Sequence, residues 1–247
     1  MNIPDPLTAL MLLNHAATPP GGMGVPARDL SQEQARDLCV YYALNNMLVL
    51  EKAITFGKDA RPTYPAVGER STLGLTIAGV NFVPDNEAAS GLTKTGKMDL
   101  RTAVLAVRLA RFLSQNWGIT VLYWGGMGFG RDPNDRHGRG LAIDIHGASG
   151  HGGYYRVYRD WGKQKITLPN GTKTDAWPNT QQPYFRLDVD TRNGKFFYEL
   201  YRFLTGEAVD APRPSSIGDR SYILCPDMPD NYWRPKHQDH IHCEIGR

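Results

Sequence analysis

The sequence has few cysteines and no paired cysteine motif. Its three cysteines, Cys39, Cys225 and Cys243, are an odd number and show no Cys-x-x-Cys spacing. This excludes a cysteine-rich zinc site and argues against a disulfide framework. A single disulfide between two of the three would still be compatible with the sequence outside the cytosol.

Long apolar runs and dense basic clusters are also missing. No stretch approaches the roughly 18 apolar residues of a membrane-spanning helix, so we predict no membrane span. The formal net charge is only +3 and no Lys/Arg-rich run accompanies it, which does not indicate a nucleic-acid partner. The hydrophobic fraction of 41% and the charged fraction of 21% are typical of a soluble globular protein.

The first twenty residues lack the features of a secretory signal peptide. Their apolar run at residues 7–13 is short, and Asp5 rather than a basic residue precedes it. We therefore expect a chain that is synthesised in the cytosol without a standard signal. Any action outside the cytosol would then depend on lysis or on a dedicated secretion machinery.

The first part of the chain predicts one helix between irregular segments. Residues 1–30 are rich in proline and glycine and predict a loose arm. Ser31 and Gln34 form a capping-box pattern at the start of a helical periodicity that we predict to run over residues 31–57. Residues 58–96 are interrupted by glycine and proline and predict no clear element.

The second part predicts both helices and strands. Residues 97–118 and 191–206 have apolar side chains at helical spacing, each followed or ended by glycine. The β-rich runs that predict strands are "ITVLYW" (119–124), "LAIDIH" (141–146), "SYILCP" (221–226) and "HIHCEI" (240–245), together with strands around an Asn170-Gly171 turn within 154–177.

These elements predict an α+β fold with a small, mainly antiparallel sheet packed against helices. We place it in residues 97–247. Residues 31–96 would then form a helical and irregular accessory region, preceded by the arm of residues 1–30.

Histidines are concentrated in the second half, since six of the seven lie at or after His137. In the C-terminal strand, alternation places His240, His242 and Glu244 on one side and the apolar residues on the other. The apolar side would face the core. The histidine side would then face a groove.

The strand predicted at residues 141–146 has the same alternation, with Asp144 and His146 on one side. The two strands could pair, and His137, seven residues before Asp144, could fold over the shared face from the preceding loop. His137, Asp144 and one histidine of the terminal pair would supply the three N/O ligands of a catalytic zinc site.

Zinc lowers the pKa of a bound water to around 7, and a neighbouring imidazole or carboxylate must accept the water's proton. The candidates for that step are Asp239, His240 and His237.

Two segments carry a resemblance to a known family. "HGRGLAID" (137–144) is similar to the His-x-x-Gly-x-Ala-x-Asp signature of the LAS zinc peptidases, a group that includes D-Ala-D-Ala carboxypeptidases, penicillin-insensitive murein endopeptidases and the hedgehog fold. "DHIH" (239–242) resembles the second motif of that group, an acidic residue three places before a ligand histidine. The wider "HQDHIHCEI" looks most like the murein endopeptidase version. The resemblance covers about residues 97–146 and 231–246.

The resemblance implies one Zn²⁺ per chain, bound by His137, Asp144 and His242. It implies Asp239 as the general base, with His240 and His237 assisting proton transfer or holding the tetrahedral intermediate. His240 competes for the role of base, because in an ideal strand Asp239 would face away from His242 unless the strand begins at His240 or is bulged.

The segment "GFGR" (128–131) is similar to the Gly-aromatic-Arg turn of the family. Arg131 would then bind the substrate carboxylate or the developing oxyanion, for which a guanidinium fork is suited. Pairing of Arg131 with Asp132 or Asp135 is the structural alternative. The family usually has serine where this chain has Asp135.

The function implied by the resemblance is hydrolysis of peptide bonds in peptidoglycan stem peptides or crosslinks next to D-alanine, by an endopeptidase or a carboxypeptidase. Cleavage between L-Ala and D-Glu, as in phage lysis enzymes of the group, is a further possibility within this class. The alternative is a non-catalytic, zinc-containing binding module of the hedgehog type. Peptidoglycan lies in the periplasm or cell wall, so the absent signal favours a phage lysis enzyme or a secreted antibacterial effector. Residues 1–96 could then serve delivery, recognition by an immunity protein, or regulation.

Overall fold

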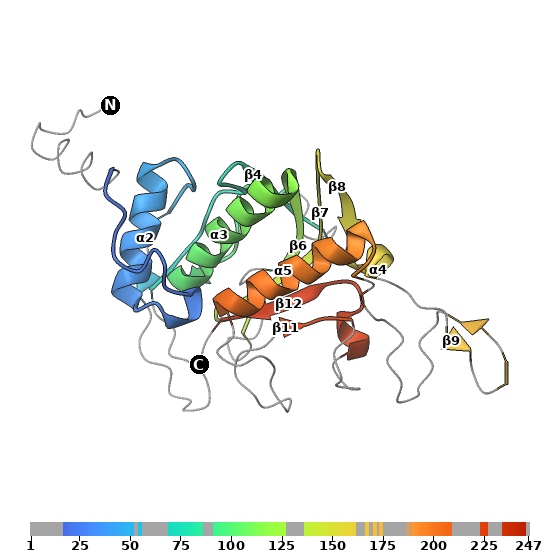
Figure 1. Ribbon diagram of the computed structural model, residues 1–247. Coiled ribbons are helices and arrows are strands. Elements are labelled where there is room, and N and C mark those ends of the chain that lie inside the picture. The colour runs from blue at the N-terminus through green and yellow to red at the C-terminus, as the bar shows by residue number, and fades with distance from the viewer. Residues whose placement is uncertain are drawn as a thin grey trace, which may run out of the picture.

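The computed structural model in Figure 1 describes the following residues: 17–51, 54–55, 69–85, 91–126, 136–161, 166–167, 170–171, 173–174, 187, 189–208, 223–226 and 234–245. They form a mixed α/β structure with a three-stranded antiparallel sheet, a larger mixed sheet and packed helices. The predicted combination of helices with a mainly antiparallel sheet is confirmed at this level. The larger sheet has seven strands and is therefore not the small sheet that the sequence predicts.

The larger sheet has the strand order β11-β12-β7-β6-β4-β3, with β8 paired to β7. Within the described strands, β4 and β6 run parallel and the other neighbours run antiparallel. The bounds are β3 Thr76–Ile77, β4 Val80–Pro84, β6 Ile119–Gly126, β7 Ala142–Gly150, β8 Gly153–Arg156, β11 Ile223–Leu224 and β12 Ile241–Glu244. Two of its strands come from residues before 97, where the sequence predicts no clear element.

Helices α3 (Leu100–Trp117) and α5 (Arg192–Ala208) lie against one face of this sheet, as Figure 1 shows. Helix α3 begins where the Asp99 carboxylate accepts the backbone N–H of Arg101 at 2.9 Å, and it ends at Gly118 in the left-handed region. Both helices are confirmed, although α5 continues to Ala208. The hydrophobic core lies between these helices and the sheet, where apolar residues of β7 and β12 are fully buried.

Helix α2 (Gln32–Leu44) packs beside α3 and is shorter than predicted. Its capping box is confirmed, with Ser31 and Gln34 bonded reciprocally at 3.0 Å. The helix does not continue to residue 57, because the Asn45 amide donates to the carbonyl of Tyr41 and Asn46 adopts a φ of 56°. Asparagine is one of the few residues that tolerates this left-handed conformation, and it ends the helix.

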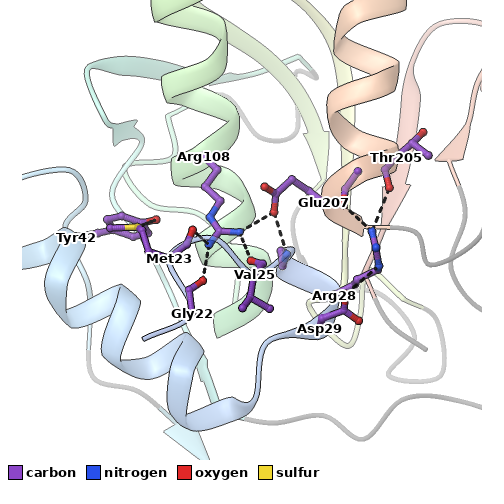
Figure 2. Close-up of polar contacts among 11 residues, drawn as sticks. Gly22, Met23, Val25, Arg28, Asp29, Tyr42, Arg108, Thr205 and Glu207 are labelled. Atoms are coloured by element: carbon purple, nitrogen blue, oxygen red, sulfur yellow. Dashed lines mark hydrogen bonds and ion pairs between the residues drawn. The ribbon is translucent and has the colours of Figure 1, made fainter. Parts of the chain in front are cut away.

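Figure 2 shows how the segment before α2 is attached to α3 and α5. Arg108 of α3 donates to three backbone carbonyls within residues 22–25 and to the carboxylate of Glu207 in α5, over 2.7–3.1 Å. Glu207 also accepts the backbone N–H of Ala27, which is fully buried. Arg28 donates to the carbonyl of Gly206 at the end of α5. The described part of the first thirty residues is thus bonded to both helices.

The remaining elements are short. They are the 3-10 helices η1 (Ala27–Asp29) and η3 (Arg234–His237), the helix α4 (Val157–Asp160), the strands β1 (Ile54–Thr55), β2 (Glu69–Ser71) and β5 (Met98–Asp99) of the three-stranded sheet, and the hairpin of β9 (Ile166–Thr167) and β10 (Lys173–Thr174). This hairpin confirms the turn at Asn170-Gly171, where Gly171 has a φ of 80°.

One predicted strand is corrected, since residues 157–160 form the helical turn α4. The Asp160 carboxylate accepts the backbone N–H of Arg156 at 2.8 Å, which satisfies a donor at the start of the turn.

The structure also shows the state of the cysteines and the character of the helices. All three cysteines are buried and free, and burial raises the pKa of the Cys39 and Cys243 thiols. Among the described residues we find no helix with the length and apolar character of a membrane span.

Candidate metal centre

Three buried side chains bring their ligand atoms to one point. His137 Nε2 lies 2.9 Å from His242 Nδ1 and 3.1 Å from Asp144 Oδ1, and the latter two atoms lie 2.7 Å apart. All three residues are buried. This group can hold a metal ion, and its members are the three ligands implied by the sequence motifs.

Strand pairing brings two of the ligands together. Strands β7 and β12 are antiparallel neighbours in which His242 lies opposite Asp144. Side chains directly opposite on one face of an antiparallel pair lie within about 5.5 Å at their β-carbons, so both reach the same point. The predicted pairing of these strands is confirmed, and their isoleucines, Ile143 and Ile241, are buried in the core.

The third ligand, His137, comes from a tight turn at residues 136–140. Gly140 closes the turn with a φ of 72°, donating its N–H to the carbonyl of His137 at 2.9 Å. The Gly140 carbonyl accepts the N–H of Asp99 and the hydroxyl of Thr102, which attaches the turn to the start of α3. A β-carbon at Gly140 would lie 2.5 Å from the α-carbon of Met98, so this position requires glycine.

The charges in the site stabilise one another. Burial alone would raise the pKa of Asp144, but hydrogen bonds with His137 and His242 hold that pKa well below its usual value. Burial would likewise lower the pKa of His242, yet its bonds to Asp144 and Glu244 raise that pKa to about 10. In the metal-free protein the His242 imidazole is therefore protonated at neutral pH.

Glu244 and Arg136 support the ligand His242. The carboxylate of Glu244 accepts a hydrogen bond from His242 Nε2 at 2.9 Å, which leaves Nδ1 directed at the metal position. The Arg136 guanidinium lies 3.3 Å from Glu244 and donates to the carbonyl of Ile245. Sequence reasoning assigned neither residue a role. The alternation that places Glu244 beside His242 was the signal for the first of them.

The donor set fits a divalent transition metal. Two imidazoles and one carboxylate are the ligand types of catalytic zinc sites. Ligand atoms on a tetrahedral shell of 2.0–2.1 Å radius lie about 3.3 Å apart, so the three atoms would separate by only a few tenths of an ångström on binding. The residues therefore fit a metal ion, while the ligand types alone do not select zinc among divalent metals.

The predicted proton-transfer residues lie beside this centre, with the Asp239 side chain exposed and His237 buried. Asp239 and His240 precede β12, so strand alternation does not apply to Asp239. His240 Nδ1 lies 2.8 Å from Asp239 Oδ1, while His240 Nε2 lies 3.7 Å from Asp144 Oδ1. The hydrogen bond from His240 lowers the pKa of Asp239, whose side chain is 55% exposed. The buried His237 ring lies 4.8 Å from that of His240.

Arg131, proposed from sequence to bind a carboxylate or an oxyanion, lies outside the described residues, as does Asp135. His146, which alternation places on the same side of its strand as Asp144, makes contacts outside the ligand group. Its Nδ1 lies 3.4 Å from a carboxylate oxygen of Asp85, and its ring stacks on His240.

Comparisons with models of known protein families, with curated proteins and with solved structures found no match to this chain. The resemblance to LAS peptidases therefore stays a prediction that rests on the two motifs.

Proposed function

We propose that this chain is a zinc metallopeptidase that hydrolyses peptide bonds of peptidoglycan stem peptides or crosslinks next to D-alanine. One observation carries the proposal: His137, Asp144 and His242, which lie in the two motifs, converge on a single buried point. Because the first and last of these are 105 residues apart, the motif spacing alone does not bring them together.

The proposal extends to the metal and the fold. A bound zinc ion supplies Lewis-acid activation of water and of the scissile carbonyl. Two of the ligands lie on neighbouring antiparallel strands and the third in the turn before β7, with helices on the opposite face, and this arrangement supports a fold of the hedgehog and D-Ala-D-Ala peptidase type.

The chain's own residues would move the proton. His240 donates its Nδ1–H to Asp239, which leaves Nε2 on the side of the metal ligands. In this tautomer Nε2 can accept a proton from the attacking water and return it to the leaving amine. Asp239 would orient the ring and stabilise its charged form. The sequence motif favours Asp239 as the base, and the contacts of His240 support the imidazole in that role.

The proposed place of action is the periplasm or cell wall, reached by a phage lysis enzyme or a secreted antibacterial effector. This location follows from the proposed substrate, because peptidoglycan lies outside the cytoplasm. In the effector case, an immunity or delivery protein would be a partner.

The test is mass spectrometry of muropeptides released from purified sacculi by the zinc-loaded protein, which identifies the bond that is cut. We expect Asp144→Asn to lose both zinc and hydrolysis. Asp239→Asn and His240→Gln should keep zinc and lose hydrolysis, with the greater loss at the residue that acts as the base. His151→Asn, in the exposed turn between β7 and β8, is the matched histidine control and should cut as the wild type does.

If the wild type binds zinc and releases no fragments, and Asp239→Ala and His240→Ala behave in the same way, the peptidase proposal is wrong. A binding module would then be the correct alternative.

A further inference from the structure

We infer that His146 is a positioning residue that holds the His240 ring beside the metal ligands, supported by Asp85, Arg156 and Gly125. This inference rests on the proposed function, because it concerns the residue that would move the proton. His146 is not among the three ligand residues, and its Nδ1 faces Asp85.

The backbone of β7 is irregular at His146. Pairing with β6 passes from Tyr123 opposite Gly147 to Trp124 opposite Ile145, so His146 has no cross-strand partner on β6. Such a bulge redirects a side chain and is common next to active sites. Here the residue without a partner lies two positions after the ligand Asp144.

The neighbouring strand leaves space for the ring. A β-carbon built at Gly125 of β6 would overlap Nε2 of His146 and lie 2.9 Å from its Cδ2. The imidazole therefore lies directly against the β6 backbone. Any side chain at Gly125 would displace it, which gives this glycine a specific steric role.

A carboxylate faces the other edge of the ring and is itself bound by a guanidinium. His146 Nδ1 lies 3.4 Å from Asp85 Oδ2, and the second oxygen of Asp85 accepts a hydrogen bond from Arg156 at 2.8 Å. Asp85 also donates its backbone N–H to the carbonyl of Trp124 in β6. Asp85 follows β4, so the region before residue 97 contributes directly to this cluster.

His240 is then enclosed from several directions. Its ring stacks on His146 with centroids 5.2 Å apart and planes 26° from parallel. Asp239 is bonded to Nδ1, and the His237 ring lies 4.8 Å away. Rotation of the His240 ring would break the stack and the hydrogen bond together. His146 therefore fixes the plane in which Nε2 is presented toward Asp144.

The experiment compares the zinc-loaded wild type with His146→Ala, Gly125→Ala and, as the control, His151→Ala. In protein labelled with ¹³C-histidine, the ring signals of His240, assigned by their loss in His240→Gln, should shift in the first two variants and not in the control. Zinc affinity should change by less than about threefold, because neither substitution removes a ligand and a β-carbon at Gly125 meets Asp144 only at an ordinary contact distance of 3.4 Å. We expect kcat on muropeptides to fall by about tenfold or more with KM within about twofold, as for a misplaced acid–base group.

Asp85→Asn keeps His146 in place and removes one of its supports, so it should shift the His240 signals in the same direction by less. Circular dichroism verifies that each variant is folded. If His146→Ala does not fold, the shift of the His240 signals in Asp85→Asn tests the inference instead. Unchanged His240 signals in the folded variants would overturn the inference, as would a loss of zinc equal to that of Asp144→Asn. If the wild type cuts nothing, the proposed function is wrong. The spectra still test whether His146 positions the His240 ring, because they do not depend on hydrolysis.

Discussion

At the scale of single residues, His242 uses both of its ring nitrogens. Nδ1 lies among the ligand atoms, and Nε2 is bonded to Glu244, which is held in turn by Arg136. A carboxylate on the second nitrogen selects the tautomer of a ligand histidine and makes the ring a stronger donor to the metal. Glu244 therefore affects metal binding without being a ligand.

We predict that Glu244→Gln weakens zinc binding by about 10–100-fold, because the amide keeps the shape of the side chain but removes its charge. Competition with a chromophoric chelator measures the affinity. Glu33→Gln, on the exposed surface of α2, is the matched control and should bind zinc as the wild type does. Equal affinities for the wild type and Glu244→Gln would show that the carboxylate does not support the ligand.

The raised pKa of His242 predicts a proton released on metal binding. Below a pKa of about 10 the metal-free ring carries a proton that the ion must displace, whereas Asp144 is already ionised. Apparent affinity should therefore rise by about tenfold per pH unit between pH 6 and 8. Titration calorimetry in buffers of different ionisation enthalpy should find at least about one proton released per ion. A pH-independent affinity would contradict this assignment.

At the scale of elements, the turn carrying His137 depends on its attachment to the start of α3. Gly140 combines a positive φ with carbonyl bonds to Asp99 and Thr102, and Arg70 of β2 donates to the carbonyl of Gly138 at 3.0 Å. The turn that carries the first metal ligand is thus positioned by hydrogen bonds that its backbone carbonyls accept from two other elements.

We predict that Gly140→Ala lowers the free energy of unfolding by at least about 2 kcal/mol, because alanine disfavours this φ and its β-carbon would meet the Met98 backbone. Thermal unfolding should show a fall of roughly 4–8 °C. Gly206→Ala is the control, since a β-carbon there meets nothing within 4 Å in α5, and it should be neutral or stabilising. A stable Gly140→Ala would mean that the turn can relax.

Arg108 also connects separate elements, because it joins the segment before α2 to α3 and α5 (Figure 2). Arg108→Met removes a charged donor from several carbonyls and from Glu207, so we expect a loss of about 3 kcal/mol in stability. Residues 17–30 should also become more accessible to proteases. Arg111→Met, one turn along α3, is the matched control. Equal melting temperatures for the two variants would exclude this role of Arg108.

At the scale of the whole molecule, the metal ligands join distant parts of the chain. His137 and His242 are 105 residues apart, and they meet only when β12 pairs with β7. A bound ion should therefore stabilise the folded protein as a unit. At a zinc concentration of 100 times the dissociation constant, we expect about 2.7 kcal/mol of added stability.

The corresponding rise in melting temperature is roughly 5–10 °C, measured by calorimetry with and without a chelator. Asp144→Asn should show no rise, which separates the site from non-specific zinc effects. A wild type whose melting temperature does not respond to zinc would argue against a metal centre.

Local sequence patterns determined the parts of this protein that depend on short-range physics. Ser31 and Gln34 mark a helix start, Gly118 marks a helix end, and strand alternation places Asp144 and His242 on matching faces. These features depend on residues a few positions apart. Alternation and spacing pointed to His137, Asp144 and one histidine of the terminal pair, and the resemblance to the LAS motifs implied His242 as that histidine.

The tertiary structure alone decided which segments meet. It pairs β4 with β6, brings Asp85 to His146 and places Arg136 on Glu244. It also joins Arg108 to the N-terminal segment. No periodicity encodes these partners, because their contacts form only when side chains distant in sequence are packed into a common core.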